Sequence, residues 1–242
     1  MTLEENLRID LAAAFRLIHE LNMHESVANH LSAAVSTDGK QFLMNRRWVH
    51  FSNVTASNLQ LLNSDDATVM DSDQAPDTSA WTIHGNLHRA LPEAKVILHL
   101  HSTYATVLST LKDPRILPID NNTARFYERI AYDTNFGGIA TSNEEGQRII
   151  ATLAGKKALM MGNHGVTVIG ETVAEAFESL YYLEKACKTM VLAYATGREL
   201  NVLPHELALK TAVSWDEFSG AAFAHFEQLK AKLDRKDPSY RA

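Results

Sequence analysis

The segment Val96-Ile97-Leu98-His99-Leu100-His101 is a short apolar run that ends in a His-x-His pair, and it predicts a buried strand. Side chains alternate between the two faces of a strand, so His99 and His101 share one face, about 6 to 7 Å apart along it. Both imidazoles can then reach one metal ion, because zinc–nitrogen bonds are about 2.0–2.1 Å long. The competing interpretation is two unrelated histidines, one hydrogen-bonded in the core and one at the strand end.

Helical patterns precede and follow this strand. The strongest begin at two capping boxes, Ser142-Asn143-Glu144-Glu145 and Thr172-Val173-Ala174-Glu175, in which side chains satisfy the first backbone amides of a helix. The predicted helices span residues 3–22, 80–90, 102–111, 142–153, 172–196 and 214–233. We expect the charged tail after the last helix to be frayed.

Strand patterns alternate with these helices. The predicted strands span residues 30–35, 41–44, 96–101, 158–161 and 166–169. The first two flank Ser36-Thr37-Asp38-Gly39, whose Asp-Gly pair is typical of a hairpin turn. The alternation predicts an α/β fold with one domain over residues 1–242, and the hairpin argues against an all-parallel sheet.

The composition excludes several classes of function. The net charge is -6 with both signs interspersed, so a clustered basic face for nucleic acid is absent from the sequence. The apolar runs fall short of the roughly 20 residues that span a bilayer. The acidic start lacks the pattern of a secretory signal, and the single cysteine, Cys187, cannot form an intrachain disulfide. We therefore expect a cytoplasmic protein that binds neither nucleic acid nor membranes.

A third histidine, His164, stands in Asn163-His164-Gly165 between two apolar strands. The glycine permits a tight turn, and a polar ring at the end of a strand is well placed for a functional site. An ordinary turn histidine is the alternative.

His84 and His88, four residues apart on a predicted helix, are interpreted as structural. The remaining isolated histidines support no inference from sequence; they are His19, His24, His50, His205 and His225.

In combination, these motifs resemble the class II aldolase/adducin family, over about residues 7–200. The segments that carry the resemblance are Asn29-His30-Leu31-Ser32, Thr78-Ser79-Ala80-Trp81-Thr82-Ile83-His84, His99-Leu100-His101-Ser102-Thr103-Tyr104-Ala105, Asn163-His164-Gly165-Val166, Ala174-Glu175-Ala176-Phe177 and Tyr182-Leu183-Glu184. The resemblance implies a three-layer α/β/α domain with a mostly antiparallel sheet. It also implies a homo-oligomer, commonly a tetramer with active sites between subunits.

The resemblance assigns His99, His101 and His164 as ligands of a divalent metal ion, with zinc expected and manganese, cobalt or iron as alternatives. Such an ion can polarise a carbonyl or hydroxyl oxygen and stabilise an enediolate. Aldol cleavage, epimerisation and decarboxylation all pass through anions of this kind. The implied partner is therefore a small-molecule substrate.

The catalytic carboxylate of the aldolase-type members is missing, because Ala80 occupies its place in Thr78-Ser79-Ala80-Trp81. Glu25 is a candidate substitute, although a glutamate is more commonly a plain surface residue. Tyr127 is a candidate acid that would reach a neighbouring subunit's site, with Tyr132 as a competitor. A tyrosine among arginines and aromatic residues is also a common packing residue.

The phosphate-binding pattern of the family is incomplete as well. Asn29, Thr78 and Ser79 match substrate-contacting positions, but the family's Thr-Gly pair is replaced near Asn45-Arg46-Arg47-Trp48. Arg46 could bind a carboxylate with two hydrogen bonds, and a solvated loop charge is the alternative. The sequence thus predicts a metal-dependent lyase-like enzyme for a small oxygenated acid or sugar. Its alternative is a non-catalytic, adducin-like assembly or interaction module.

Overall fold

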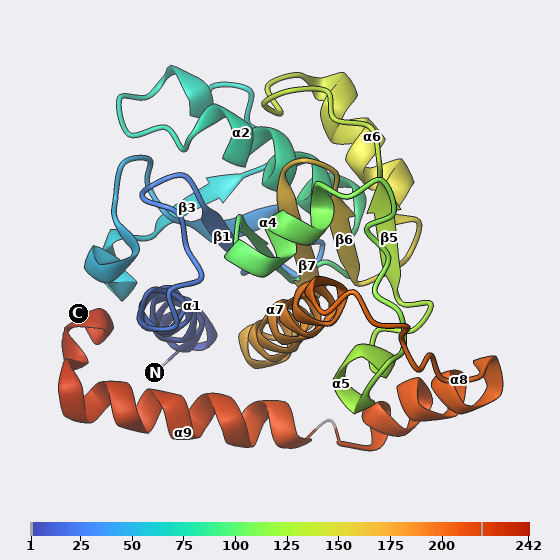
Figure 1. Cartoon of the computed structure of the whole chain (residues 1–242). Coiled ribbons are helices and arrows are strands. Elements are labelled where there is room, and N and C mark those ends of the chain that lie inside the picture. Colours follow the sequence, from blue (N-terminus) through green and yellow to red (C-terminus); the bar gives the residue numbers. More distant parts are fainter. Residues whose placement is uncertain (1, 219) are drawn as a thin grey trace.

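The computed structural model describes residues 2–218 and 220–242, which build a seven-stranded sheet with helices on both faces (Figure 1). The strands are β1 (His30–Ala34), β2 (Gln41–Met44), β3 (Gln60–Asn63), β4 (Val96–Leu100), β5 (Ile130–Asp133), β6 (Ala158–Met161) and β7 (Gly165–Gly170). Their order is β3-β2-β1-β4-β7-β6-β5, and neighbours run antiparallel except the parallel pair β5–β6. The predicted mostly antiparallel sheet is confirmed.

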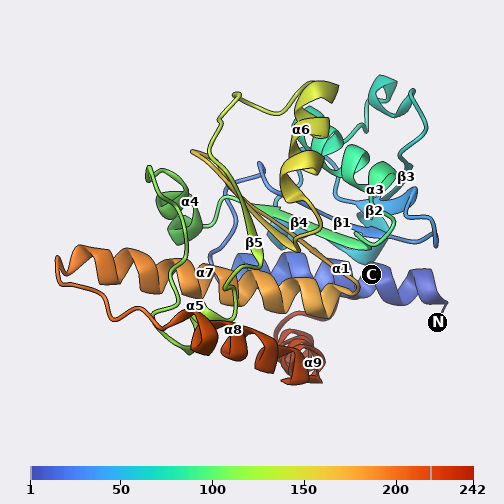
Figure 2. The ribbon, with the colours of Figure 1, turned by 90° about the vertical axis from the view of Figure 1, so that its right-hand side faces the viewer.

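Two helical layers enclose the sheet (Figure 2). One face is covered by α1 (Leu3–Glu20) and α7 (Val173–Ala195), and α9 (Gly220–Lys236) lies beyond them against both. The other face is covered by α3 (Asn86–Ala90) and α6 (Asn143–Leu153). The shorter helices are α2 (Thr78–Ala80), α4 (Thr103–Ser109), α5 (Asn121–Ala124) and α8 (His205–Ser214). The predicted α/β/α layering is therefore confirmed.

Strand β4 lies in the middle of the sheet, and its side chains alternate as predicted. Val96, Leu98 and Leu100 join the apolar cluster formed with α1 and α7. Ile97 joins the cluster on the opposite face, with α3 and α6. Each such buried aliphatic side chain contributes roughly 1.5–3 kcal/mol of transfer free energy, so the orientation of β4 is strongly fixed. His99 consequently points toward the face of α3 and α6.

Local signals in the sequence account for most helix boundaries. Ser142 accepts a hydrogen bond from the Glu145 backbone N–H, and Thr172 does the same for Glu175, so both predicted capping residues begin their helices. The helix predicted from residue 80 begins earlier, at Thr78, because the Asp77 side chain caps it. Between α2 and α3 it contains a π-helical turn, Trp81–Gly85.

The C-terminal part differs from the prediction. The segment expected as one last helix from Ser214 contains a 3-10 turn (Trp215–Phe218) and α9, whereas α8, which ends at Ser214, was not predicted. The tail is ordered instead of frayed: Pro238–Arg241 form another 3-10 turn, and Tyr240 is fully buried. The Tyr240 hydroxyl donates to Asp234 at 2.7 Å, which anchors the turn to α9. None of the described helices combines the length and the apolar character needed to cross a membrane.

Candidate metal centre

His99, His101 and His164 lie together at one end of β4 and β7. His99 is the fourth residue of β4, His101 directly follows the strand, and His164 directly precedes β7. The Nε2 atoms of His99 and His101 are 3.1 Å apart, and one ring nitrogen from each histidine lies within 4.8 Å of the others. Ligands bound tetrahedrally to zinc through bonds of about 2.0–2.1 Å are separated by roughly 3.3 Å. The three residues, here called the histidine centre, therefore fit a divalent ion.

A hydrogen bond on the side of the ring that faces away from the centre determines the tautomer of His99. Its Nδ1 lies 3.1 Å from the hydroxyl of Thr167, the residue opposite it on β7. That hydroxyl points its own hydrogen at the sulfur of Met161, 3.4 Å away, so we assign the proton between His99 and Thr167 to Nδ1. The Nε2 lone pair of His99 is then directed into the centre, as metal binding requires.

Glu25 plays the corresponding part for His101. Its Oε2 lies 2.6 Å from Nδ1 of His101. A carboxylate that accepts from Nδ1–H leaves the Nε2 lone pair free and makes it a better ligand, an arrangement common behind metal-bound histidines. Glu25 is a surface residue, as the alternative interpretation held, with 60% of its side chain exposed, and it contacts His101 from that position.

Burial keeps two of these rings neutral. It lowers the pKa of His164 to about 4, with the neighbouring His101 adding to the effect. The pKa of His99 lies well below its ordinary value for the same reason, and His30 is its largest electrostatic neighbour. Neutral imidazole is the form that binds a metal, so the site is prepared for an ion at neutral pH.

Close packing of the backbone explains the sequence Asn163-His164-Gly165. Asn163, not the glycine, takes the left-handed conformation of the turn, with φ of 55°. Gly165 is required for another reason: a Cβ there would lie 2.4 Å from the Leu100 carbonyl oxygen and 3.0 Å from Cδ2 of His101. The missing side chain lets β7 approach β4 closely enough to bring His164 beside His101.

The end of β4 is also held by α7. The Glu184 carboxylate accepts hydrogen bonds from the Ser102 hydroxyl at 2.7 Å and from the backbone N–H groups of Tyr104 and Ala105. These groups form the first turn of α4, where unsatisfied amides favour a negative charge. Glu184 thus fixes the strand-to-helix junction next to His101. It lay within the motif Tyr182-Leu183-Glu184, but the sequence did not reveal this role.

A row of buried polar groups lies behind the histidine centre. His30 pairs with His99 across β1 and β4, and the two rings stack with centroids 4.8 Å apart. His30 Nδ1 contacts His84 at 2.8 Å, and Ser32 Oγ lies 2.6 Å from His84 and 2.7 Å from His88. His84 and His88 therefore have the packing role predicted for them.

Two of the predicted substrate-binding residues offer unused donors. Asn29 is buried and its Oδ1 accepts from the Glu25 backbone N–H at 2.7 Å, while its Nδ2 has no partner among the described residues. Arg46 Nε is likewise buried without a partner there. Nδ2 of Asn45, the residue before Arg46, donates to the Asn29 carbonyl oxygen at 3.5 Å, so the two chain segments are neighbours. Unsatisfied buried donors are uncommon and suit an anionic ligand.

The other predicted residues have mixed placements. Ser79 gives its hydroxyl to Asp77 at 2.5 Å, and Thr78 follows the same cap. Ala80 is buried in a small apolar cluster with Phe42 and Met44, so no carboxylate stands in its place. The sequence did not single out Asp77. Its carboxylate raises the pKa of His30 and so opposes part of the lowering caused by burial.

Neither tyrosine reaches the histidine centre within one chain. The Tyr127 hydroxyl lies 2.9 Å from Nδ1 of His205, at the surface near α8. The Tyr132 hydroxyl accepts from the Ile116 backbone N–H at 3.0 Å, and burial raises its pKa to about 12. Tyr132 is thus a structural residue, and any catalytic part for Tyr127 requires a second subunit.

A helix-covered antiparallel sheet with three histidines at one strand end is the arrangement of a known class of proteins. The chain matches the model of the class II aldolase and adducin N-terminal domain over residues 9–191. It belongs to this family.

Relatives within the family have diverse names. A Caulobacter vibrioides protein named after the class 2 aldolases is 31% identical over 98% of this chain and 92% of its own length. Decarboxylase NovR of Streptomyces niveus is 29% identical over 66% of this chain and 59% of its own. Alpha-adducin of Rattus norvegicus is 32% identical over 83% of this chain but only 28% of its own length.

Solved structures agree with the fold. An aldolase II superfamily protein from Pseudomonas syringae has a TM-score of 0.90 and 29% identity, covering 100% of this chain and 97% of its own. The L-fuculose 1-phosphate aldolase from Glaciozyma antarctica has a TM-score of 0.84 and 24% identity, covering 99% and 93%. The similarity to the L-fuculose 1-phosphate aldolase concerns the fold alone.

Proposed function

We propose that this chain is a metal-dependent, lyase-like enzyme that acts on a small oxygenated acid or sugar. The observation that supports it most is the convergence of three histidines, two of which, His99 and His101, have their outer nitrogens held by Thr167 and Glu25. Metal-bound histidines commonly have such a partner on the ring nitrogen that does not bind the ion. A divalent ion held there, with zinc as our expectation, supplies Lewis-acid polarisation of a substrate oxygen.

The chain's own residues supply the rest of the site. Asn29 Nδ2 and Arg46 Nε are donors without partners among the described residues, and we assign to them the acidic group of the substrate. Decarboxylase NovR shows that relatives with 29% identity include a protein named for carboxylate chemistry. A carboxylic or keto acid is therefore the preferred substrate class, and a phosphorylated sugar is the second.

Proton transfer must use a group other than residue 80. Glu25 has an exposed carboxylate whose Oε1 makes no hydrogen bond within the described residues, so it can take a proton while Oε2 holds His101. Tyr127 is the candidate acid from a neighbouring subunit.

Phe136 and Ile139, which are 54% and 78% exposed, lie in the segment beside His164. This apolar rim supports a homo-oligomer, with a tetramer expected, whose subunits meet near the centre. The proposed cytoplasmic location rests on the composition of the sequence.

Two observations favour a second function. Ala80 is packed among apolar side chains, and alpha-adducin is 32% identical over the shared region. A non-catalytic, adducin-like module that retains a structural metal would need no carboxylate at position 80. In that case the ion would hold β4 and β7 together without any turnover.

The deciding experiment is a substrate screen on protein loaded separately with zinc, manganese and cobalt. The panel contains hydroxy acids, keto acids and phosphorylated sugars. We expect activity on at least one acid, abolished in His101→Ala and preserved in the control His225→Gln, because His225 contacts Glu178 on α7 rather than the centre. Stoichiometric metal with no activity on the whole panel would favour the adducin-like function. Absence of any metal bound by these three histidines would refute both.

A further inference from the structure

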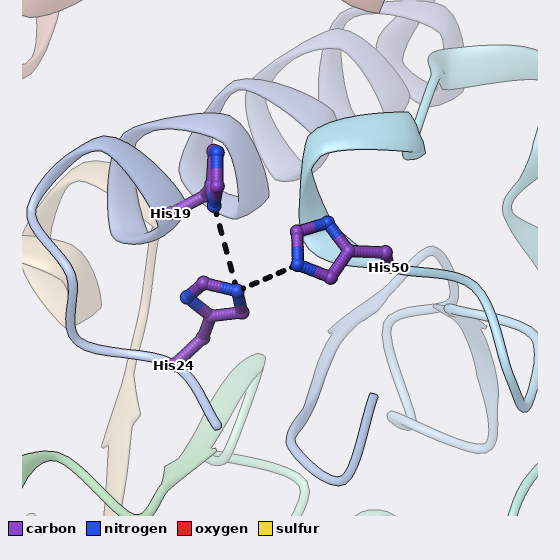
Figure 3. A group of neighbouring side chains, drawn as sticks. All are labelled: His19, His24 and His50. Atoms are coloured by element: carbon purple, nitrogen blue, oxygen red, sulfur yellow. Dashed lines mark hydrogen bonds between the residues drawn. The ribbon is translucent and has the colours of Figure 1, made fainter. Parts of the chain in front are cut away.

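Three histidines outside the described site meet near the C-terminal end of α1 (Figure 3). His19 belongs to the last turn of α1, His24 lies in the loop that follows it, and His50 directly precedes a 3-10 turn, η1 (Phe51–Asn53). All three rings are partly buried. We call this group the second cluster. In the sequence its members are up to 31 positions apart (50 − 19), and no spacing motif connects them.

The ring nitrogens of the second cluster converge on one point. His24 Nε2 lies 3.0 Å from His50 Nε2 and 3.4 Å from His19 Nδ1, and all three nitrogens lie within 4.8 Å of one another (Figure 3). Their ring centroids form a triangle with sides of 4.9, 5.1 and 4.9 Å. The histidine centre forms a triangle of 5.0, 4.9 and 4.6 Å. The two groups therefore have nearly the same dimensions.

Hydrogen bonding alone does not satisfy this geometry. A neutral imidazole nitrogen carries either one proton or one lone pair, so it makes one good hydrogen bond. His24 Nε2 faces two other ring nitrogens at once, and at least one of these contacts lacks a proper donor or acceptor. A metal ion accepts lone pairs from all three nitrogens together, which removes the conflict.

The rings are also held in place by their surroundings. His24 stacks on Phe51 with centroids 5.3 Å apart. His50 Nδ1 faces the Ser52 hydroxyl at 2.7 Å and the Ser52 backbone N–H at 3.2 Å, so it can donate to the first or accept from the second. An ion at Nε2 selects donation to the hydroxyl. Burial lowers the pKa of His19 and of His24, which favours their neutral, metal-binding forms.

We propose that His19, His24 and His50 form a second binding site for a divalent transition-metal ion of the zinc class. Three imidazoles without a carboxylate suit zinc, cobalt, nickel or copper and disfavour magnesium and calcium. The three protein ligands leave a fourth position for water. The bound ion joins the end of α1 to the loop at His24 and to η1, so it links three separate parts of the chain.

The test is metal stoichiometry in protein that carries no polyhistidine tag. The full chain is stripped with a chelator, dialysed against zinc and analysed by mass spectrometry for zinc per chain. We expect two zinc ions per wild-type chain, one in His50→Ala, one in His101→Ala and none in the double variant. His205→Ala, an exposed histidine outside both groups, should retain two.

The outcomes separate the two sites. Two ions retained in both His50→Ala and His24→Gln would overturn the second site, as would a single wild-type ion that is lost only with His101→Ala. A single ion lost only with His50→Ala would support the second site and contradict the histidine centre. Cobalt loading of His101→Ala gives an independent readout, because the visible absorption of four-coordinate cobalt should remain there and disappear when His50→Ala is added. Circular dichroism verifies that each variant is folded.

Discussion

The carboxylate of Glu25 lies 2.6 Å from Nδ1 of His101, although 76 positions separate the two residues in the chain. The loop between α1 and β1 thus reaches over the end of β4 and orients one of the three histidines. This contact connects the N-terminal part of the fold directly to the candidate metal centre.

We expect Glu25→Ala to lower the affinity of the histidine centre for zinc by about 10–100-fold, the range found when such supporting partners are removed. Glu25→Gln should cost less, because its amide oxygen still accepts from Nδ1–H. The measurement is competition against a chromophoric chelator in the His50→Ala background, where only this centre is filled. Glu93→Gln, an exposed glutamate elsewhere, serves as control. Equal affinity in all variants would show that the contact does not support the ligand.

Gly165→Ala should disturb the centre through packing. The new methyl group would lie 2.4 Å from the Leu100 carbonyl oxygen, so β4 and β7 must separate. We expect a loss of about 1–3 kcal/mol in the free energy of unfolding, together with weaker zinc binding. Denaturant titration and the chelator competition measure the two effects. Gly220→Ala, where a Cβ meets nothing within 4 Å, should leave zinc affinity unchanged. A fully stable, zinc-binding Gly165→Ala protein would contradict the close-approach argument.

The metal-free protein should lose stability in mild acid. Burial lowers the pKa of His30 and of His88 to about 3, against 6.5 in the unfolded chain. Between these values the unfolded state binds more protons than the folded state, so stability is complete above pH 6.5 and falls as the pH drops toward 3. Each histidine contributes a slope of at most about 1.4 kcal/mol per pH unit.

Urea unfolding of chelator-treated protein at about pH 7.5 and about pH 5 measures this slope. His88→Gln keeps a group that can hydrogen-bond Ser32 but cannot titrate, so its slope should be smaller than that of the wild type. Identical stability at the two pH values would contradict the buried, neutral state of these histidines.

A separate prediction concerns the ordered C-terminus. Tyr240→Ala should lower the free energy of unfolding by roughly 3–5 kcal/mol, because it empties a fully buried aromatic position. Tyr240→Phe removes only the hydrogen bond to Asp234 and should cost about 1 kcal/mol. Thermal or denaturant unfolding distinguishes the two. A Tyr240→Ala protein as stable as the wild type would mean that the tail does not pack on α1 and α9.

The sequence predicted the parts of the fold that depend on local signals. The caps at Ser142 and Thr172 and the apolar alternation of β4 are each determined by a few neighbouring residues. The outermost strands, β3 and β5, were missed because an edge strand of four residues has a partner on one side only and needs little apolar pattern. The burial of Tyr240 depends on α1, more than 200 residues away, so the tail could not be assigned from its charged composition.

The candidate site, like the fold, was predictable only where local signals determine it. Strand alternation placed His99 beside His101, whereas His164 joined them only through the family resemblance. The supporting contact of Glu25 and the close approach of Gly165 are tertiary contacts, and no local sequence pattern predicts them. The second cluster was missed for the same reason, because His50 approaches His19 and His24 only after the chain has folded.

One feature of the loop after α1 links both groups of histidines. His24 points into the second cluster, and the next residue, Glu25, holds His101. If both sites bind metal as proposed, filling one restricts a peptide unit that the other also uses, so the two affinities should be thermodynamically coupled and equal in effect in both directions. Zinc affinity at the histidine centre, compared between wild type and His50→Ala, would reveal that coupling; identical values would show that two adjacent residues of one loop serve two independent ions.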